Sequence, residues 1–270
     1  MALAFDDRGI GDPLVLIHGL GTNRWIWGEA ASGLARERRV IALDLPGFGD
    51  SEPLGPRFEL DAVADAVVEE AGTRAGERFD LLGHSLGGAV TLTAARRHPG
   101  VVRRLILHAP AGFRPRSAPL AEAVAAAAPL ALSARRVVAR PVAGFGIARR
   151  ALLWGAIHDP SRLTTAQARA MVDASRGAAH LREAARVAIA ADLAKDLELL
   201  NTPVGFIWGD RDPLMPRSTQ ELLRRLRPEA PVRVISDAAH VAQLERPDLY
   251  TDAVKRLLER LGSGSVAPTR

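Results

Sequence analysis

A Gly-x-Ser-x-Gly pattern from Gly83 to Gly87 is the feature of this sequence that most restricts its fold. It follows the apolar run 79–82 and precedes helix-forming sequence over 89–97. A strand that enters a helix through so short a turn must hold Ser85 in a strained backbone conformation, and the two glycines leave room for strand and helix to approach. Strain of this kind is kept where it presents a side chain for chemistry. The alternative is a glycine-rich turn with a solvated serine, but the strand before it and the helix after it favour a nucleophile, with the helix N-terminus beneath to favour negative charge.

Apolar runs on either side of this unit predict a parallel sheet. They are continuous rather than alternating, which is typical of strands buried on both faces. The predicted strands cover residues 3–5 (with a turn at 6–12), 13–19, 39–44, 79–82, 102–108, 203–208 and 231–235. The predicted helices cover residues 25–36, 60–72, 89–97, 218–227 and 248–261. The alternation of strands and helices predicts an α/β fold, a mostly parallel open sheet with helices on both faces.

The sequence changes character between residues 111 and 201. No strand pattern appears there, alanine and arginine dominate, and several prolines interrupt helix-forming stretches. A segment of this length is too long for a loop inside one compact domain and is better explained as a helical insertion. We therefore expect residues 1–110 to be the first part of the core, 111–201 a helical cap, 202–262 the second part of the core, and 263–270 a disordered tail.

The charge of the chain argues against a nucleic-acid partner. The net charge is +5, and the segment from Phe113 to Leu200 alone holds 13 basic and 7 acidic residues, so the rest is close to neutral. There is one tyrosine, and the basic residues are not interleaved with aromatic ones, so stacking platforms for bases are poorly supplied. An exposed basic face is ordinary for a surface helix, so no membrane contact is expected either.

Several other classes of protein are excluded or not expected. The chain has no cysteine, which excludes disulfides and a cysteine nucleophile. No histidine pair has the helical spacing of metal ligands, and no Gly-x-Gly segment carries the third glycine of a dinucleotide site, so neither a metal nor a cofactor is expected. Without a signal peptide or a membrane-length apolar run, we expect a soluble cytoplasmic protein, either a monomer or a homodimer.

A nucleophilic serine needs a base, and the base needs an acid. Among the seven histidines, His240 alone follows the last predicted strand, where a loop can reach over the edge of the sheet. His18 is better placed to brace the glycine loop in which it lies. For the acid, Asp210 and Asp212 both follow the strand that ends at residue 208, where catalytic groups of parallel sheets gather. Asp212 is favoured, and Asp210 is expected to cap the turn.

The oxyanion of a tetrahedral intermediate needs hydrogen-bond donors, each worth about 3–4 kcal/mol. The backbone N–H of Leu86, at the start of the helix, is one candidate. The backbone N–H of Leu20, in the glycine-rich loop after the strand 13–19, is the other. The residues expected to line the substrate pocket are His18, Gly19, Trp25 and His84.

Five short motifs stand in a fixed order along the chain. They are His18-Gly19 after a strand, Asp44-x-Pro46-Gly47-x-Gly49-x-Ser51, Gly83-His84-Ser85-Leu86-Gly87-Gly88, Trp208-Gly209-x-x-Asp212-Pro213, and His240-x-x-x-x-Glu245-Arg246-Pro247. Together they resemble the α/β-hydrolase superfamily over nearly the whole chain, with residues 111–201 matching a helical cap inserted after the sixth strand. The resemblance implies Ser85 as nucleophile, Asp212 as acid and His240 as base. It also implies Leu20 and Leu86 as oxyanion donors and a structural role for Asp44.

The resemblance implies a serine hydrolase that cleaves a small or medium carboxylic ester, lactone or thioester, a small-molecule partner, through an acyl-enzyme on Ser85. Serine in place of aspartate at this turn speaks against haloalkane dehalogenases and epoxide hydrolases. Carbon–carbon bond hydrolases of ring-cleavage products usually carry an aromatic residue after the catalytic histidine, where this chain has Val241. That activity, a cofactor-free haloperoxidase-like activity and a ligand-binding receptor of the same fold remain the alternatives.

The basic cap carries one further hypothesis. Arginines of the insertion could select acidic substrates, because a guanidinium pairs well with a carboxylate. The residues considered for this role are Arg135, Arg136, Arg149 and Arg150.

Overall fold

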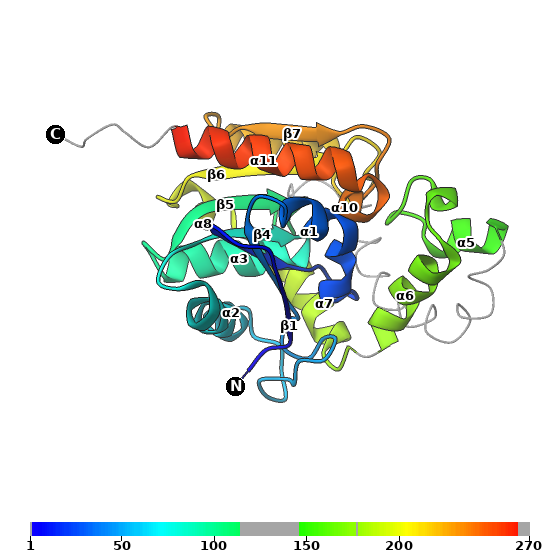
Figure 1. The fold of residues 1–270 in the computed structure, drawn as a ribbon, viewed down its shortest axis with the longest axis horizontal. Helices are drawn as coiled ribbons and strands as arrows, with labels where there is room; N and C mark the ends of the chain where they lie inside the picture. The colour runs from blue at the N-terminus through cyan, green and yellow to red at the C-terminus, as the bar shows by residue number, and fades with distance from the viewer. Residues whose placement is uncertain (1, 114–145, 177, 264–270) are drawn as a thin grey trace.

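A seven-stranded sheet organises the part of the chain that the computed structural model describes, residues 2–113, 146–176 and 178–263 (Figure 1). The strand order is β1-β3-β2-β4-β5-β6-β7, and every pair is parallel except β1 with β3. In chain order the strands are β1 (Phe5–Arg8), β2 (Pro13–Ile17), β3 (Arg39–Leu43), β4 (Phe79–His84), β5 (Val102–His108), β6 (Val204–Gly209) and β7 (Val232–Ile235). The predicted mostly parallel α/β sheet is confirmed.

The direction in which the sheet grows reverses between β2 and β4. These strands are neighbours, with β3 added on one side of them and β5, β6 and β7 on the other. In open parallel sheets, ligands bind in the crevice outside the carboxyl ends of the strands at such a reversal. The loop beginning at His18 follows β2, and Ser85 follows β4, so both candidate segments lie at this point.

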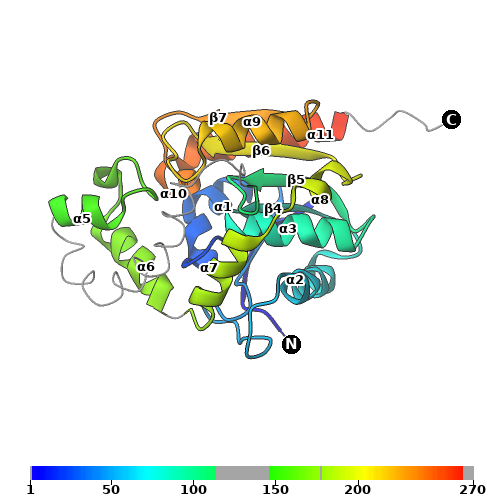
Figure 2. The ribbon, with the colours of Figure 1, turned by 180° about the vertical axis from the view of Figure 1, so that it is seen from behind.

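Helices cover both faces of the sheet, as Figures 1 and 2 show from opposite sides. Side chains of β2 alternate between two apolar clusters, Leu14 and Leu16 in one and Val15 and Ile17 in the other. The helices of the first cluster's face are η1 (Arg24–Trp27), α1 (Gly28–Leu34), α10 (Ala242–Glu245) and α11 (Pro247–Ser263). The helices of the other face are α2 (Leu60–Ala75), α3 (Leu86–Arg97) and α9 (Arg217–Leu226).

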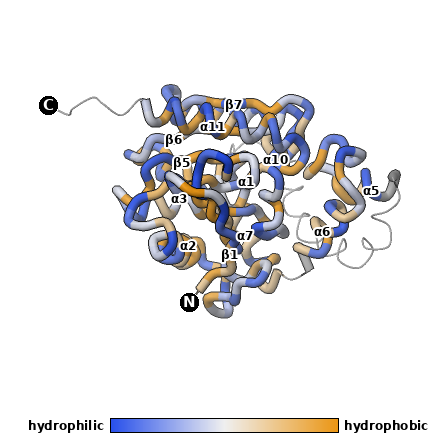
Figure 3. The backbone as a smooth tube through the Cα atoms, in the orientation of Figure 1, coloured by the Kyte–Doolittle hydropathy of each residue, from blue (hydrophilic) through white to orange (hydrophobic). Residues whose placement is uncertain are grey.

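Polar and apolar residues alternate along the helices, which is visible in the mixed colouring of α11 in Figure 3. This pattern is that of a helix with one face on the core and one in water. No helix of the described residues combines the length and the apolar character needed to cross a lipid bilayer.

The edge strand β1 differs from its prediction. A strand at residues 3–5 followed by a turn was expected, because two aspartates and a glycine follow. The strand instead covers Phe5–Arg8 and pairs antiparallel with β3. Both aspartates stay in the strand because each forms an ion pair with an arginine of another segment. Asp7 pairs with Arg39 at 2.6 Å, and Asp6 pairs with Arg24 at 3.2 Å. Tertiary contacts therefore override the local turn preference.

The described part of the insertion is helical. It contains α5 (Gly146–Leu152), η2 (Pro160–Arg162), α6 (Thr165–Arg176), α7 (Leu181–Ala190) and α8 (Ala194–Glu198). The insertion follows β5, the fifth strand of this sheet rather than a sixth, because the described chain places one antiparallel and four parallel strands before it. Arg135 and Arg136 lie outside the described residues, and the proposed boundaries of the cap and tail stay predictions.

Candidate active site

Ser85 stands at the junction of β4 and α3 in a strained conformation. Its backbone has φ +54° and ψ −114°, in a region that residues with a side chain rarely adopt. The Ser85 N–H donates to the carbonyl of His108 at 2.9 Å, and the Ser85 carbonyl accepts the N–H of Ala111 at 2.9 Å. The first bond comes from the last residue of β5 and the second from the segment just after it, so the neighbouring strand and its continuation hold the strained residue in place. Strain of this kind persists only when the surroundings over-determine it.

The two glycines of the motif are required by close packing. A Cβ on Gly83 would stand 2.2 Å from the carbonyl oxygen of Gly87, and a Cβ on Gly87 would stand 2.4 Å from the carbonyl oxygen of Ile17. No side chain fits at either distance. The pattern therefore follows from the contact of α3 with β2 and β4.

Asp212 and His240 form a hydrogen-bonded pair at the carboxyl end of the sheet. Asp212 Oδ2 lies 2.8 Å from His240 Nδ1, and the carboxylate is almost entirely buried. This bond keeps the ring proton on Nδ1 and leaves Nε2 able to accept a proton. Asp210 Oδ1 instead accepts the N–H of Ala238 at 3.4 Å. The structure thus pairs the histidine with Asp212 and uses Asp210 in the turn.

The predicted oxyanion donors belong to two backbone segments next to Ser85. Leu86 is the first residue of α3, so its N–H has no acceptor within the helix. Leu20 follows Gly19, and a Cβ on Gly19 would stand 3.2 Å from the Cβ of Ser85. The glycine loop therefore lies directly against the serine, so the segments that carry both predicted donors are next to Ser85.

His18 stabilises this loop through hydrogen bonds of its ring. Its ring is fully buried, Nε2 accepts the N–H of Leu45 at 3.0 Å, and Nδ1 donates to the carbonyl of Gly19 at 2.9 Å. The hydroxyl of Thr22 donates to the same carbonyl at 2.9 Å. Burial lowers the pKa of His18, so the ring is neutral and joins the loop after β2 to the turn after β3.

A column of buried rings supports the histidine loop. His84 Nε2 donates to the carbonyl oxygen of His240 at 2.9 Å, and the His84 ring centroid lies 4.4 Å from that of His108. His108 Nδ1 in turn lies 3.1 Å from the hydroxyl of Tyr250. Burial lowers the pKa of His84 and of His108 well below the usual value, with nearby histidines adding to the effect. His84 is thus a neutral support under His240.

Two members of this column, His108 and Tyr250, were not identified from the sequence. A signal for His108 existed, because parallel pairing of β4 with β5 aligns His84 with His108. Tyr250 lies 142 positions further along the chain than His108, and no local sequence pattern indicates that the two side chains meet.

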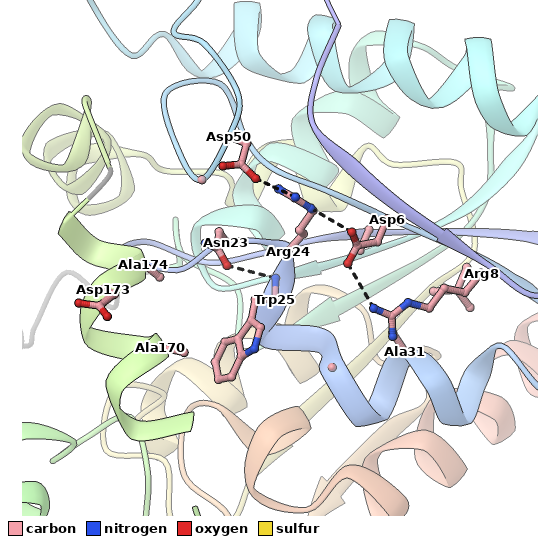
Figure 4. Close-up of a pocket in the computed structure, with 14 residues that line it drawn as sticks. Asp6, Arg8, Asn23, Arg24, Trp25, Ala31, Asp50, Ala170, Asp173 and Ala174 are labelled. Atoms are coloured by element: carbon pink, nitrogen blue, oxygen red, sulfur yellow. Dashed lines mark hydrogen bonds and ion pairs between the residues drawn. The ribbon is translucent and has the colours of Figure 1, made fainter. Parts of the chain in front are cut away.

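Trp25 lines a cavity whose walls do not include the predicted catalytic residues. A cavity of about 700 Å³ lies between η1, β1, the turn at Asp50 and α6, and the ring of Trp25 extends across it toward Ala170 (Figure 4). None of Ser85, Asp212 and His240 lines this cavity, so its size alone does not make it the reaction site.

A buried carboxylate fixes the position of η1. Asp44 is fully buried, and its oxygens accept the N–H of Arg24 at 2.6 Å and the N–H of Asp50 at 2.9 Å. The guanidinium of Arg24 also contacts Asp44, and reaches Asp50 at 2.8 Å and Asp6 at 3.2 Å (Figure 4). These carboxylates raise the pKa of Arg24. Asp44 thus ties the strand ends together, in keeping with a structural role.

The described residues contain no group of three or more histidine, aspartate or glutamate side chains placed to hold a metal ion. The chemistry that the arrangement can perform is that of a serine with a histidine–aspartate pair and backbone donors.

Comparisons with known proteins agree with this geometry. The sequence matches the family model described as alpha/beta hydrolase fold over residues 12–247. It is 33% identical over 258 residues to the dihydrolipoyllysine-residue acetyltransferase component of an acetoin cleaving system of Pseudomonas putida, covering 93% of this chain but only 64% of that relative. It is 32% identical over 260 residues to the pimeloyl-[acyl-carrier protein] methyl ester esterase of Neisseria meningitidis, covering 93% of this chain and 80% of the relative. A solved thermophilic esterase from Thermogutta terrifontis superposes with a TM-score of 0.75 at 27% identity, covering 96% of this chain and 93% of that one.

Proposed function

Because the chain belongs to the α/β-hydrolase family, we propose that it is a serine hydrolase that cleaves a small or medium carboxylic ester, lactone or thioester. The observation that carries the proposal is the combination of a strained Ser85 at the sheet reversal with the 2.8 Å bond between Asp212 and His240. Strained nucleophile, oriented histidine and adjacent backbone donors are the parts that acyl transfer needs.

The reaction would begin with proton transfer from Ser85 Oγ to His240 Nε2 as the oxygen attacks the carbonyl carbon. Asp212 would stabilise the imidazolium that forms. The N–H groups of Leu20 and Leu86 would hold the oxyanion, each contributing about 3–4 kcal/mol to the barrier reduction. The imidazolium then protonates the leaving group, and a water activated by His240 hydrolyses the acyl-enzyme.

An ester substrate has support from two relatives. One relative is named a methyl ester esterase, and a solved structure of the same fold is an esterase. Val241, in the position after His240, gives no support for a carbon–carbon bond hydrolase, the alternative with the same catalytic residues. Within the proposed class, these comparisons favour a carboxylic ester, without a commitment to its acyl group.

The test is hydrolysis of p-nitrophenyl esters of graded acyl length, from acetate to dodecanoate. The proteins compared are the wild type, Ser85→Ala, and Ser218→Ala, a control at an exposed serine of α9. We expect turnover by the wild type and by the Ser218 variant, and loss of a factor of about 10⁶ when Ser85 is removed. Folded wild-type protein without turnover on any ester would overturn the proposal and direct attention to ring-cleavage products or to ligand binding without turnover.

A further inference from the structure

The carboxylate of Glu245 is buried where the end of the short helix α10 meets the cap. Only 4% of the residue is exposed, and three backbone N–H groups donate to it. Glu245 Oε1 accepts from Asp159 at 2.7 Å, and Oε2 accepts from His158 at 3.1 Å and from Ala239 at 3.0 Å. A buried carboxylate is costly unless its oxygens are hydrogen-bonded, and here both are.

The three donors belong to two segments that lie far apart in the sequence. Ala239 immediately precedes His240, the proposed base. His158 and Asp159 lie in the cap, in the connection between α5 and η2. Glu245 therefore bonds the histidine loop and the cap connection at the same time.

A second bond joins the same two segments on the other side of His240. The N–H of Val241 donates to the carbonyl of Ala156 at 2.9 Å. The guanidinium of Arg162 adds a bond of 3.0 Å to the carbonyl of Asp237. Both chain neighbours of His240 are thus held through the cap connection 156–159, either directly or by way of Glu245.

We propose that Glu245 is a positioning residue, which fixes the loop carrying His240 to the cap connection 156–159. The base is then aimed at Ser85 only while this part of the cap is seated on the core. This inference rests on the proposed function, because it assigns a task to a residue that acts through His240. Glu245 itself does not touch the reacting atoms in this scheme.

Glutamine at this position weakens the linkage without leaving a cavity. The carboxylate uses both oxygens as acceptors, whereas an amide has one acceptor oxygen and one NH₂ group, which is a donor. In Glu245→Gln at least one of the three backbone N–H groups must therefore face another donor. A variant at Glu70 gives a matched control, since Glu70 is also buried and accepts the N–H of Leu3 at 3.0 Å, but lies on α2 and pairs with Arg74.

The experiment compares wild type, Glu245→Gln and Glu70→Gln by kcat and KM on the best ester, and by the proton NMR signal of the His240 Nδ1 hydrogen. A displaced base should lower kcat by about tenfold to a hundredfold, as small misplacements of catalytic groups do. The Nδ1 signal should broaden or shift with it. Glu70→Gln should keep both values, even if its melting temperature falls. An unchanged kcat, or a lower kcat with the His240 signal unaltered, would overturn the proposal.

A second measurement needs no variant. In wild-type protein, the amides of Ala239, His158 and Asp159 should exchange their hydrogens as one group, with opening constants that agree within about tenfold. Exchange of the two cap amides about a hundredfold faster than that of Ala239 would mean that the segments open independently, and would sink the inference.

These readouts separate the two proposals. If the wild type fails on every ester, the proposed function is wrong, while the His240 signal and the amide exchange still report on the linkage. If the wild type is active and Glu245→Gln matches it, only the linkage is wrong.

Discussion

Asp212 divides its two carboxylate oxygens between His240 and the backbone. Oδ2 lies 2.8 Å from His240 Nδ1, while Oδ1 accepts the N–H groups of Leu214 and Met215 at 2.8 and 3.1 Å. The turn after β6 therefore fixes the orientation of the carboxylate independently of the histidine. The loop 236–241 brings the ring to an acceptor that is already aligned.

This division predicts the effect of Asp212→Asn. The two backbone N–H groups will hold the amide oxygen, so the NH₂ group must face His240 Nδ1. The ring proton then moves to Nε2, and the histidine can no longer accept a proton from Ser85. We expect kcat to fall by a factor of about 10⁴ with the fold retained. In the matched Asp210→Asn variant kcat should stay within a few-fold of wild type. A similar loss of kcat in both variants would contradict the assignment of Asp212 as the acid.

A single methyl group on the glycine loop should impair the reaction. In Gly19→Ala the new Cβ would stand 2.9 Å from His84 Nδ1 and 3.2 Å from Ser85 Cβ, so the loop must move. Because this loop carries Leu20, whose N–H is a proposed oxyanion donor, we expect kcat to fall by about tenfold to a hundredfold.

Gly72→Ala is the control for that change, because nothing lies within 4 Å of a Cβ at that helical position. It should leave kcat unchanged and raise the free energy of unfolding by about 0.5–1 kcal/mol. Steady-state kinetics and urea unfolding measure both effects. Full activity of Gly19→Ala would show that the loop is not part of the site.

Buried neutral histidines should make the fold sensitive to mild acid. Burial lowers the pKa of His18, His84 and His108, whereas an unfolded histidine titrates near pH 6.5. Below about pH 6.5 the unfolded chain therefore binds protons that the folded chain does not. The contribution of these neutral rings to the free energy of unfolding is complete above that pH. It declines as the pH falls toward their lowered pKa values, by up to about 1.4 kcal/mol per pH unit for each ring.

Urea unfolding between about pH 7.5 and 5.5 tests this dependence. His108→Asn should reduce the slope of the unfolding free energy against pH by the contribution of one ring, up to about 1.4 kcal/mol per pH unit. Equal slopes in wild type and His108→Asn would contradict a buried neutral His108.

Much of the core could be predicted from local pattern. Strands β2 to β7 are apolar runs that end in turn residues, so their type and approximate position follow from the sequence. Ser85 could be located because the glycines on either side of it are dictated by contact between backbones. The order of Asp212 and His240 after successive strands placed them at one sheet edge, although the 2.8 Å bond between them required the structure.

The parts that were missed depend on contacts between distant residues. The edge strand β1 owes its extent to ion pairs with arginines 18 and 32 positions away. The support of His84 by His108 and Tyr250 joins three separate elements. Glu245 stood in a recognised motif, but its partners in the cap lie 86 and 87 positions earlier. Local propensity carries no information on such pairs.

The two ends of the inserted segment meet. The N–H of Leu193 donates to the carbonyl of Gly112 at 2.9 Å, one residue after Ala111, whose own N–H is bonded to the Ser85 carbonyl. The chain thus leaves the core and returns to it at a single point next to the strained serine. Because the ends of such an insertion lie side by side, residues between them can be replaced without changing the path of the core chain. Other parts of this segment can accordingly be exchanged without rerouting the core, provided that the connection 156–159 and its bonds to Glu245 and Val241 are kept.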